Sequence, residues 1–224
     1  MTTPAYRAPP WLPGGNLQTL YPALLAPRPQ VVWRRERWDT PDGDFIDLDW
    51  TENRDSGLRI EDNEQPLLIL FHGLGGSSNS HYARALMHAV AQRGWQGVVV
   101  HFRGCSGELN RLPRAYHSGD SVEIDWMLQR ARMLAGAAPL FAVGVSMGGN
   151  ALLKWAGERG ISAGKIVTAM VAVSVPYELA ATGDHLALGL NRIYTWNFLS
   201  TLKAGSRRRL EQFPMLFDAA AMER

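Results

Sequence analysis

Residues 140–150 read LFAVGVSMGGN, and the order of residue types in this stretch decides the fold. The apolar run Leu140–Val145 predicts a strand, and Asn150–Gly157 predicts a helix. The turn between them, 144–148, reads GVSMG and matches the pattern G-x-S-x-G. Strand, sharp turn and helix in that order are the context in which this pattern presents a nucleophilic serine.

Gly144 and Gly148 are expected to allow the close approach of strand and helix that this sharp turn requires. A Cβ at Gly144 or Gly148 would collide with the neighbouring strand or helix. The turn should strain the backbone of Ser146, lift its hydroxyl clear of the sheet, and aim the free N–H groups of the next helix at whatever that hydroxyl attacks. Ser146 is therefore the predicted catalytic nucleophile. The alternative is a glycine-rich β–α turn that merely contains a serine.

Length, charge and cysteine content narrow the class of protein. A chain of 224 residues can bury one substantial core, and a formal charge of +2 gives no reason to expect nucleic acid. The single cysteine, Cys105, excludes an internal disulfide and favours a reducing compartment. The N-terminus lacks the apolar core of a signal peptide, and the longest apolar run, Ile166–Val175, is about half of what a membrane span needs. We expect a cytoplasmic protein without a transmembrane segment. No particular oligomeric state is predicted.

Three parts follow one another along the chain. Residues 1–30, rich in proline, predict an N-terminal arm with a short helix near Asn16–Leu25. Residues 31–176 alternate buried strands with helices, which predicts an α/β core with a mostly parallel sheet and flanking helices. Residues 177–224 are mainly helical and begin just past a strand, as a lid-like segment would. The run 207–209, three arginines, is predicted to be a solvated helix face.

The core has a recognisable order of strands and helices. The sequence Phe45–Trp50 alternates, which predicts a strand near a sheet edge with Asp47 and Asp49 on a wet face. The continuous apolar run Leu67–Phe71 predicts a parallel strand covered on both faces. Further strands are predicted at Val31–Asp39, Val98–Phe102 and Ile166–Val173, the last of them also buried. Helices are predicted at Tyr82–Arg93, with Gly94 at the C-cap, and at Asp120–Ala135.

A second motif follows the first buried parallel strand. Residues 72–76 read HGLGG. In hydrolases of this architecture, a backbone N–H from this loop joins the N–H after the nucleophile to form the oxyanion hole. Leu74 and Met147 are therefore the predicted oxyanion donors. The alternative, a phosphate-binding glycine turn, lacks the expected glycine spacing and the lysine of a P-loop.

The six histidines do not supply an obvious base. His72 is predicted to brace the oxyanion loop by hydrogen bonding rather than to act as a base. Structural or surface roles are predicted for the other five, which are His81, His88, His101, His117 and His185. No H-E-x-x-H or paired-cysteine spacing occurs, so no metal site and no cofactor are predicted.

The remaining members of a catalytic triad are missing. In an α/β-hydrolase the acid and the histidine follow the serine along the chain. After Ser146 the one histidine is His185, and the candidate acids before it are Glu158, Glu178 and Asp184. Asp184 adjoins His185, which makes their mutual orientation awkward. Ile166–Val173 would also be an apolar edge strand, which folded proteins avoid. We therefore expect a C-terminally truncated form without the last strands.

Several motifs together carry a resemblance to a known family. They are NLQT at 16–19, PDGDF at 41–45, FHGL at 71–74, HFRGCSG at 101–107, YHSG at 116–119 and GVSMGGN at 144–150. In this combination the chain resembles the YheT-like α/β-hydrolases, the bacterial relatives of ABHD1/ABHD3-type hydrolases. The resemblance implies an esterase-type hydrolase fold with Ser146 as the nucleophile. It also implies an Asp and a His on two further strands, for which this chain has no positions.

Together these observations predict a serine carboxylesterase-type hydrolase. Ser146 would attack a small-molecule ester of acyl or lipid-like character, through an acyl-enzyme. The alternative is a non-catalytic α/β-hydrolase remnant, which acts as a binding module or has no function, because a serine without its base loses most of its rate. A nucleotide-binding module is disfavoured by the absent phosphate motifs.

Overall fold

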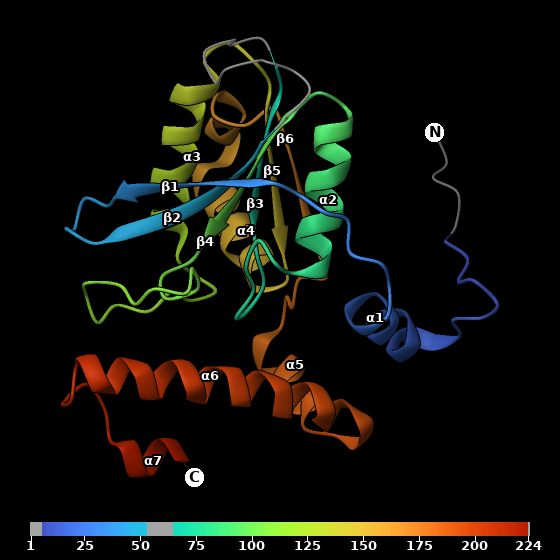
Figure 1. Ribbon diagram of the computed structural model, residues 1–224, viewed down its shortest axis with the longest axis vertical. Coiled ribbons are helices and arrows are strands. Elements are labelled where there is room, and N and C mark those ends of the chain that lie inside the picture. Colours follow the sequence, from blue (N-terminus) through green and yellow to red (C-terminus); the bar gives the residue numbers. More distant parts are fainter. Residues whose placement is uncertain (1–5, 53–64, 224) are drawn as a thin grey trace.

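The computed structural model describes residues 6–52 and 65–223, and these form a six-stranded sheet flanked by helices (Figure 1). The strands are β1 (Trp33–Asp39), β2 (Phe45–Thr51), β3 (Leu67–Phe71), β4 (Gln96–His101), β5 (Leu140–Val145) and β6 (Ala169–Val173). The helices are α1 (Gly14–Leu24), α2 (His81–Gln92), α3 (Ser121–Ala135), α4 (Met147–Arg159), α5 (Leu179–Leu186), α6 (Arg192–Gln212) and α7 (Ala219–Glu223). Two 3-10 helices, η1 (Gly160–Lys165) and η2 (Gly189–Asn191), complete the element list.

The sheet has the order β1-β2-β4-β3-β5-β6. Strands β3, β4, β5 and β6 are parallel, and β1 and β2 run antiparallel at one edge. β3 is central, with Ile69 opposite Val98 of β4 and Ala142 of β5. The expected α/β-hydrolase architecture, a mostly parallel sheet with flanking helices, is confirmed.

The two faces of the sheet bury different helices because neighbouring residues of a strand point to opposite sides. On one face Ile69 and Val98 pack with Leu128 of α3 and Trp155 of α4. On the other face Leu70 and Val99 pack with a smaller set of residues from α2, which are Ala83, Met87 and Val90. The predicted helices are confirmed, with ends that agree within three residues, and Gly94 follows α2 with a φ of +71°.

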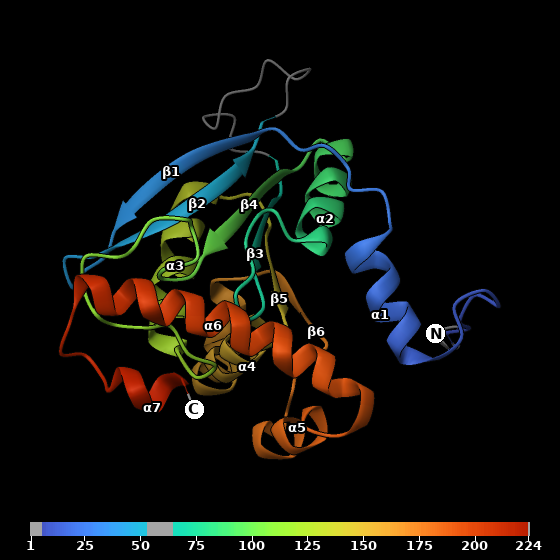
Figure 2. The same cartoon turned by 60° about the horizontal axis from the view of Figure 1, so that its bottom comes forward.

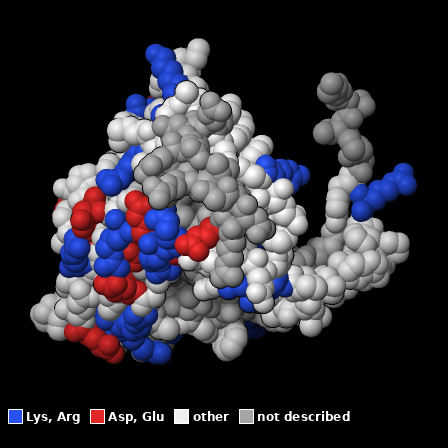
Figure 3. Space-filling view, turned by 45° about the horizontal axis from the view of Figure 1, so that its top comes forward, with Lys and Arg blue, Asp and Glu red and all other residues white. Residues whose placement is uncertain are grey.

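The prediction of a wet face on β2 is wrong. Asp47 and Asp49 are buried, and each carboxylate accepts two hydrogen bonds from one arginine of β1. These bidentate ion pairs compensate the carboxylates for their loss of water. Arg35 holds Asp49 at 2.6 Å and Arg37 holds Asp47 at 2.7 Å. Figure 3 shows basic and acidic side chains interleaved on this side of the molecule. Alternation therefore identified a polar face correctly but could not reveal that arginine side chains from the neighbouring strand cover its aspartates.

The strand predicted at Ile166–Val173 is present over a shorter range, but the prediction that it is buried is wrong. β6 has five residues, and Val171 and Val173 are 56% and 43% exposed. The preceding segment is partly taken up by η1, which ends at Lys165. Within the described residues no strand pairs with the outer side of β6, so an apolar edge is open there.

Helix α6 lies beyond the carboxyl ends of the parallel strands, where the functional site is expected (Figure 2). It carries the three arginines predicted to be solvated. Arg207 and Arg208 are exposed, as predicted, and Arg208 donates a 3.0 Å hydrogen bond to the carbonyl oxygen of Gly107, whereas Arg209 is half-buried. None of the helices in the described ranges has both the length and the apolar character that crossing a membrane requires.

Candidate active site

Ser146 occupies the sharp turn between β5 and α4. Its backbone has φ 52° and ψ −119°, in a region that L-residues rarely adopt. Its amide donates a 2.8 Å hydrogen bond to the carbonyl oxygen of Val173, and its own carbonyl accepts the amide of Asn150 at 3.1 Å. These two bonds tie the turn to the end of β6 and to the first turn of the helix, so the surrounding structure maintains the strained conformation.

The glycines of the turn are required by close packing, as predicted. A Cβ built on Gly144 would stand 2.7 Å from the carbonyl oxygen of Gly148 in α4. A Cβ on Gly148 would stand 2.5 Å from the carbonyl oxygens of both Phe71 and His72. Because these neighbours are backbone atoms, they have little freedom to move aside. The helix therefore approaches the ends of β3 and β5 more closely than any other residue type would allow.

Ser146 opens onto a hollow of about 440 Å³. Helices α1, α5 and α6 and the end of β6 provide its walls. The lining residues besides the serine are Asn16, Thr19, Ser174, Val175, Pro176, Thr182, Leu186, Tyr194 and Phe198. The serine is partly exposed rather than packed in the interior.

The loop after β3 lies beside this turn. A Cβ built on Gly73 would be 3.3 Å from the Cβ of Ser146. Leu74 lines a second cavity of about 720 Å³, bounded by the 103–116 loop and the C-terminal half of α6. Within the described residues, the amides of Leu74 and Met147 donate no hydrogen bond. Both N–H groups are thus without a protein partner; Met147 directly follows the serine, and Leu74 directly follows Gly73, which lies against it.

His72 is a structural brace, as predicted. It is fully buried, and both ring nitrogens are engaged. Nδ1 donates to the carbonyl oxygen of Gly73 at 2.6 Å, and Nε2 accepts the amide of Phe102 at 3.2 Å. Burial lowers the pKa of His72 to about 4, so the ring is neutral at physiological pH. A histidine with neither nitrogen available has no means of taking a proton from Ser146.

The structure reveals a buried histidine–aspartate pair that sequence reasoning did not find. Nε2 of His101 lies 2.7 Å from Oδ2 of Asp49, and Nδ1 lies 3.3 Å from the carbonyl oxygen of Cys105. Ser78 and Arg35 bind the same carboxylate, at 2.5 and 2.6 Å. The His101 side chain is 2% exposed, which agrees with its predicted structural role. The signal in the sequence was weak, because Asp49 and His101 lie 52 positions apart.

The candidate triad residues after Ser146 do not line its hollow. From α5, Thr182 and Leu186 face the hollow, whereas Asp184 and His185 are exposed and absent from its walls. Glu178 is also exposed, and Glu158 pairs with Lys154 one helical turn away. Among residues 6–52 and 65–223, no three His, Cys, Asp or Glu side chains are grouped so as to hold a metal ion.

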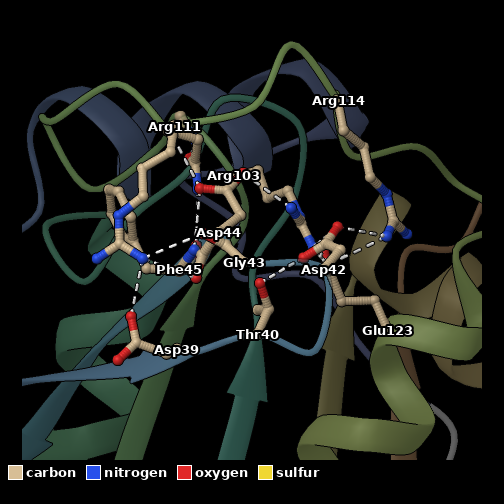
Figure 4. Close-up of polar contacts among 12 residues, drawn as sticks. Asp39, Thr40, Asp42, Gly43, Asp44, Phe45, Arg103, Arg111, Arg114 and Glu123 are labelled. Carbon is tan, nitrogen blue, oxygen red and sulfur yellow. Dashed lines mark hydrogen bonds and ion pairs between the residues drawn. The ribbon is translucent and has the colours of Figure 1, made fainter.

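A buried ion cluster fixes the loop that follows β4 (Figure 4). Arg103, 2% exposed, pairs with Asp44 at 2.8 Å, with Glu123 at 2.6 Å and with Asp42 at 3.0 Å. Burial alone would raise the pKa of Asp44, but Asn110, two backbone amides and Arg103 lower it. Burial raises the pKa of Glu123 despite the nearby arginine. The cluster joins α3, the β1–β2 turn and the loop that contains Cys105.

Comparison with known proteins agrees with the sheet order and the strained turn described above. A family model described as the alpha/beta hydrolase fold matches residues 66–217. The chain belongs to this family. It is 42% identical over 199 residues to YheT of Escherichia coli K12, whose name gives esterase as the expected activity; the match covers 89% of this chain and 56% of YheT. This confirms the resemblance to the YheT-like hydrolases.

Two further similarities extend the comparison. Human phospholipase ABHD3 is 30% identical over 201 residues, covering 90% of this chain and 49% of that protein. The Pyrococcus furiosus esterase Pf2001 superposes with a TM-score of 0.52 at 20% identity, covering 79% of this chain and 63% of that one. The last similarity supports the fold alone. The chain thus spans about half the length of the curated relatives that it matches.

Proposed function

We propose that this chain is the nucleophile-bearing part of a serine hydrolase that cleaves carboxylic esters. The Ser146 hydroxyl would attack the ester carbonyl, expel the alcohol and form an acyl-enzyme, which water then hydrolyses. The amides of Leu74 and Met147 would bind the negatively charged oxygen of the tetrahedral intermediate. The observation that carries this proposal is the strained conformation of Ser146 at the start of α4, open to a hollow.

Two lines of evidence support this assignment over a glycine-rich turn. A non-glycine residue with a positive φ stores strain, which persists at functional sites because the surrounding structure maintains it. The named activities of the relatives, an esterase and a phospholipase, both involve ester hydrolysis. These activities belong to proteins about twice as long, so for this chain the activity is a proposal.

The substrate is proposed to be a small ester with an apolar acyl group. The hollow at Ser146 includes Val175, Leu186 and Phe198, and the cavity at Leu74 includes Leu109 and Leu202. These apolar side chains offer contact surface for an apolar acyl group, and they lie among polar residues that line the same cavities. Helix α6 contributes to both cavities, which supports the view that residues 177–224 act as a lid-like cover over the site.

A binding module without catalytic activity is the second candidate. One specific observation favours it: neither His185 nor any of the three candidate acids lines the hollow at Ser146. A serine without a general base retains only the contributions of the oxyanion donors and of substrate binding. Under this proposal the chain binds an ester but does not turn it over at a useful rate.

Labelling with a fluorophosphonate probe tests whether Ser146 is a nucleophile. The probe phosphonylates activated serines and remains attached, so mass spectrometry identifies the modified residue. We expect a label on Ser146 that disappears in Ser146→Ala and persists in Ser162→Ala, a serine outside the hollow. No label on the wild-type chain, or a label that is lost with Ser174→Ala instead, would contradict the proposal.

Turnover of a short-chain p-nitrophenyl ester separates the two candidates. A steady release of nitrophenol that Ser146→Ala abolishes supports an enzyme. Binding of the ester without release of nitrophenol supports the binding module, because among the described residues none of the candidate triad residues lines the hollow at Ser146.

A further inference from the structure

The loop after β3 contains four consecutive backbone amides, and all but one are occupied. Gly73 donates its N–H to the hydroxyl of Tyr82 at 2.9 Å, and Gly75 donates to the hydroxyl of Tyr116 at 2.9 Å. Gly76 donates to the carbonyl oxygen of Gly73 at 3.0 Å. Within the described residues, the amide between the two tyrosine-bound glycines, that of Leu74, donates to nothing.

The peptide plane that carries the Leu74 amide is fixed through its other end. In a trans peptide the N–H of one residue points opposite to the C=O of the residue before it. The Gly73 carbonyl accepts Nδ1 of His72 at 2.6 Å as well as the Gly76 amide. Two donors on this oxygen set the direction of the Leu74 N–H, and the tyrosines fix the peptide planes on either side.

Each tyrosine is held firmly by a different part of the fold. Tyr82 lies in the first turn of α2, packs against the core between that helix and the sheet, and has its hydroxyl inside the loop. A Cβ built on Gly76 would be 2.8 Å from this oxygen. Tyr116 comes from the long connection after β4 and stacks on Phe102 at 5.2 Å with an interplanar angle of 1°.

Both phenols remain neutral at physiological pH. Burial raises the pKa of Tyr82, and burial together with the Cys105 thiol raises the pKa of Tyr116. A neutral hydroxyl can accept a backbone N–H while donating its own proton elsewhere. Each tyrosine is therefore suited to hold an amide without placing a negative charge beside the loop.

We propose that Tyr82 and Tyr116 are positioning residues that hold the Leu74 amide in place for the oxyanion of the reaction at Ser146. This inference rests on the proposed function. Oxyanion donors are effective when they are oriented before the reaction, because no reorganisation is then needed as charge develops. Without the two hydroxyls, the glycine-rich loop 73–76 would sample many conformations and its free amide would lose its fixed direction.

The first arm of the test measures the two tyrosine–glycine hydrogen bonds, which we call the clamp, and it requires no reaction at Ser146. The full chain is labelled with 15N-glycine, and NMR measures water exchange at the amides of Gly73 and Gly75. Tyr116→Phe should raise the exchange rate of Gly75 about tenfold, and Tyr82→Phe should do the same for Gly73, since each removes one hydrogen bond. Unchanged exchange in both variants would overturn the clamp, whatever the chain catalyses.

The second arm measures the consequence for Ser146. Each variant should lower the first-order rate constant of fluorophosphonate labelling about tenfold while the probe concentration at half-saturation stays within about twofold. Tyr6→Phe is the matched control, because Tyr6 donates its hydroxyl to Gln18 in the N-terminal arm, and it should leave both values unchanged. Because two independent tyrosines are tested, failure of one variant to fold leaves the other to decide.

The two arms distinguish the possible failures. Faster glycine exchange with an unchanged labelling rate would reduce the tyrosines to a structural role and overturn the inference. No labelling of the wild-type chain would overturn the proposed function, and with it the catalytic meaning of the clamp. Slower labelling that accompanies faster exchange at the matching glycine supports both.

Discussion

Gly148 in the first turn of α4 lies directly against the carbonyl oxygen of Phe71 at the end of β3, where a Cβ would stand 2.5 Å away. Gly148→Ala should therefore lower the free energy of unfolding by at least about 3 kcal/mol, because backbone would have to shift. The control is Gly157→Ala in the same helix, which has open space around it and should stabilise by about 0.5–1 kcal/mol. Urea denaturation measures both, and equal effects would contradict the packing argument.

The backbone strain at Ser146 predicts an unusual effect of glycine. Ser146→Gly should raise the free energy of unfolding by about 1 kcal/mol relative to Ser146→Ala, because glycine adopts a φ of 52° without a Cβ clash. The comparison is matched, since both variants lack the hydroxyl. Thermal denaturation of the two variants measures the difference. If the alanine variant is equally stable, the turn stores no strain.

The buried imidazole of His72 makes stability depend on pH. The unfolded chain binds a proton on this ring near pH 6.5, whereas the folded chain does so near pH 4, so the unfolded state holds more protons between these values. Stability should therefore fall as the pH is lowered from 6.5 to 4, by about 3 kcal/mol from this residue. His72→Gln, which keeps a donor and an acceptor, should remove this part of the dependence. Denaturation curves at several pH values test it.

The buried Arg103 cluster predicts a large loss on removal of its cation. Arg103→Met should destabilise the fold by about 3–5 kcal/mol, because the carboxylates of Asp44 and Glu123 would stay buried without their partner. Asp39→Asn, which breaks a surface pair with Arg111, should cost less than about 1 kcal/mol. Similar losses in the two variants, measured by urea denaturation, would show that Arg103 is not shielded from solvent.

Much of the fold could be predicted because its signals are local. The run Leu67–Phe71 is apolar without interruption, and the turn at 144–148 has glycines where helix and strand meet, so strand, turn and helix followed from neighbouring residues. The errors concern β2 and β6. Whether Asp49 meets water depends on Arg35 and His101, and whether Val171 is buried depends on a neighbouring strand, neither of which periodicity reports.

The same division applies to the candidate site. The serine and the glycine-rich loop could be found because each motif follows directly on a strand, and both remain proposals as catalytic groups. The tyrosines that hold the loop could not be found, because Tyr116 lies 41 positions from Gly75 and the YHSG motif at 116–119 does not indicate which amide its hydroxyl meets. A hydroxyl becomes an amide acceptor through the packing that brings it there, and packing is a property of the folded chain.

The sequence by itself determined where the chain turns, because the pattern of glycines and serine at 144–148 involves only neighbouring residues. It also determined which side chains carry nucleophilic or hydrogen-bonding groups. The tertiary structure alone decided which of these groups meet: the pairing of His101 with Asp49, the burial of Arg103, and the two tyrosines on either side of Leu74. The physical reason is that hydrogen bonds and ion pairs act over a few ångströms, whereas these partners are separated by up to 61 positions along the chain.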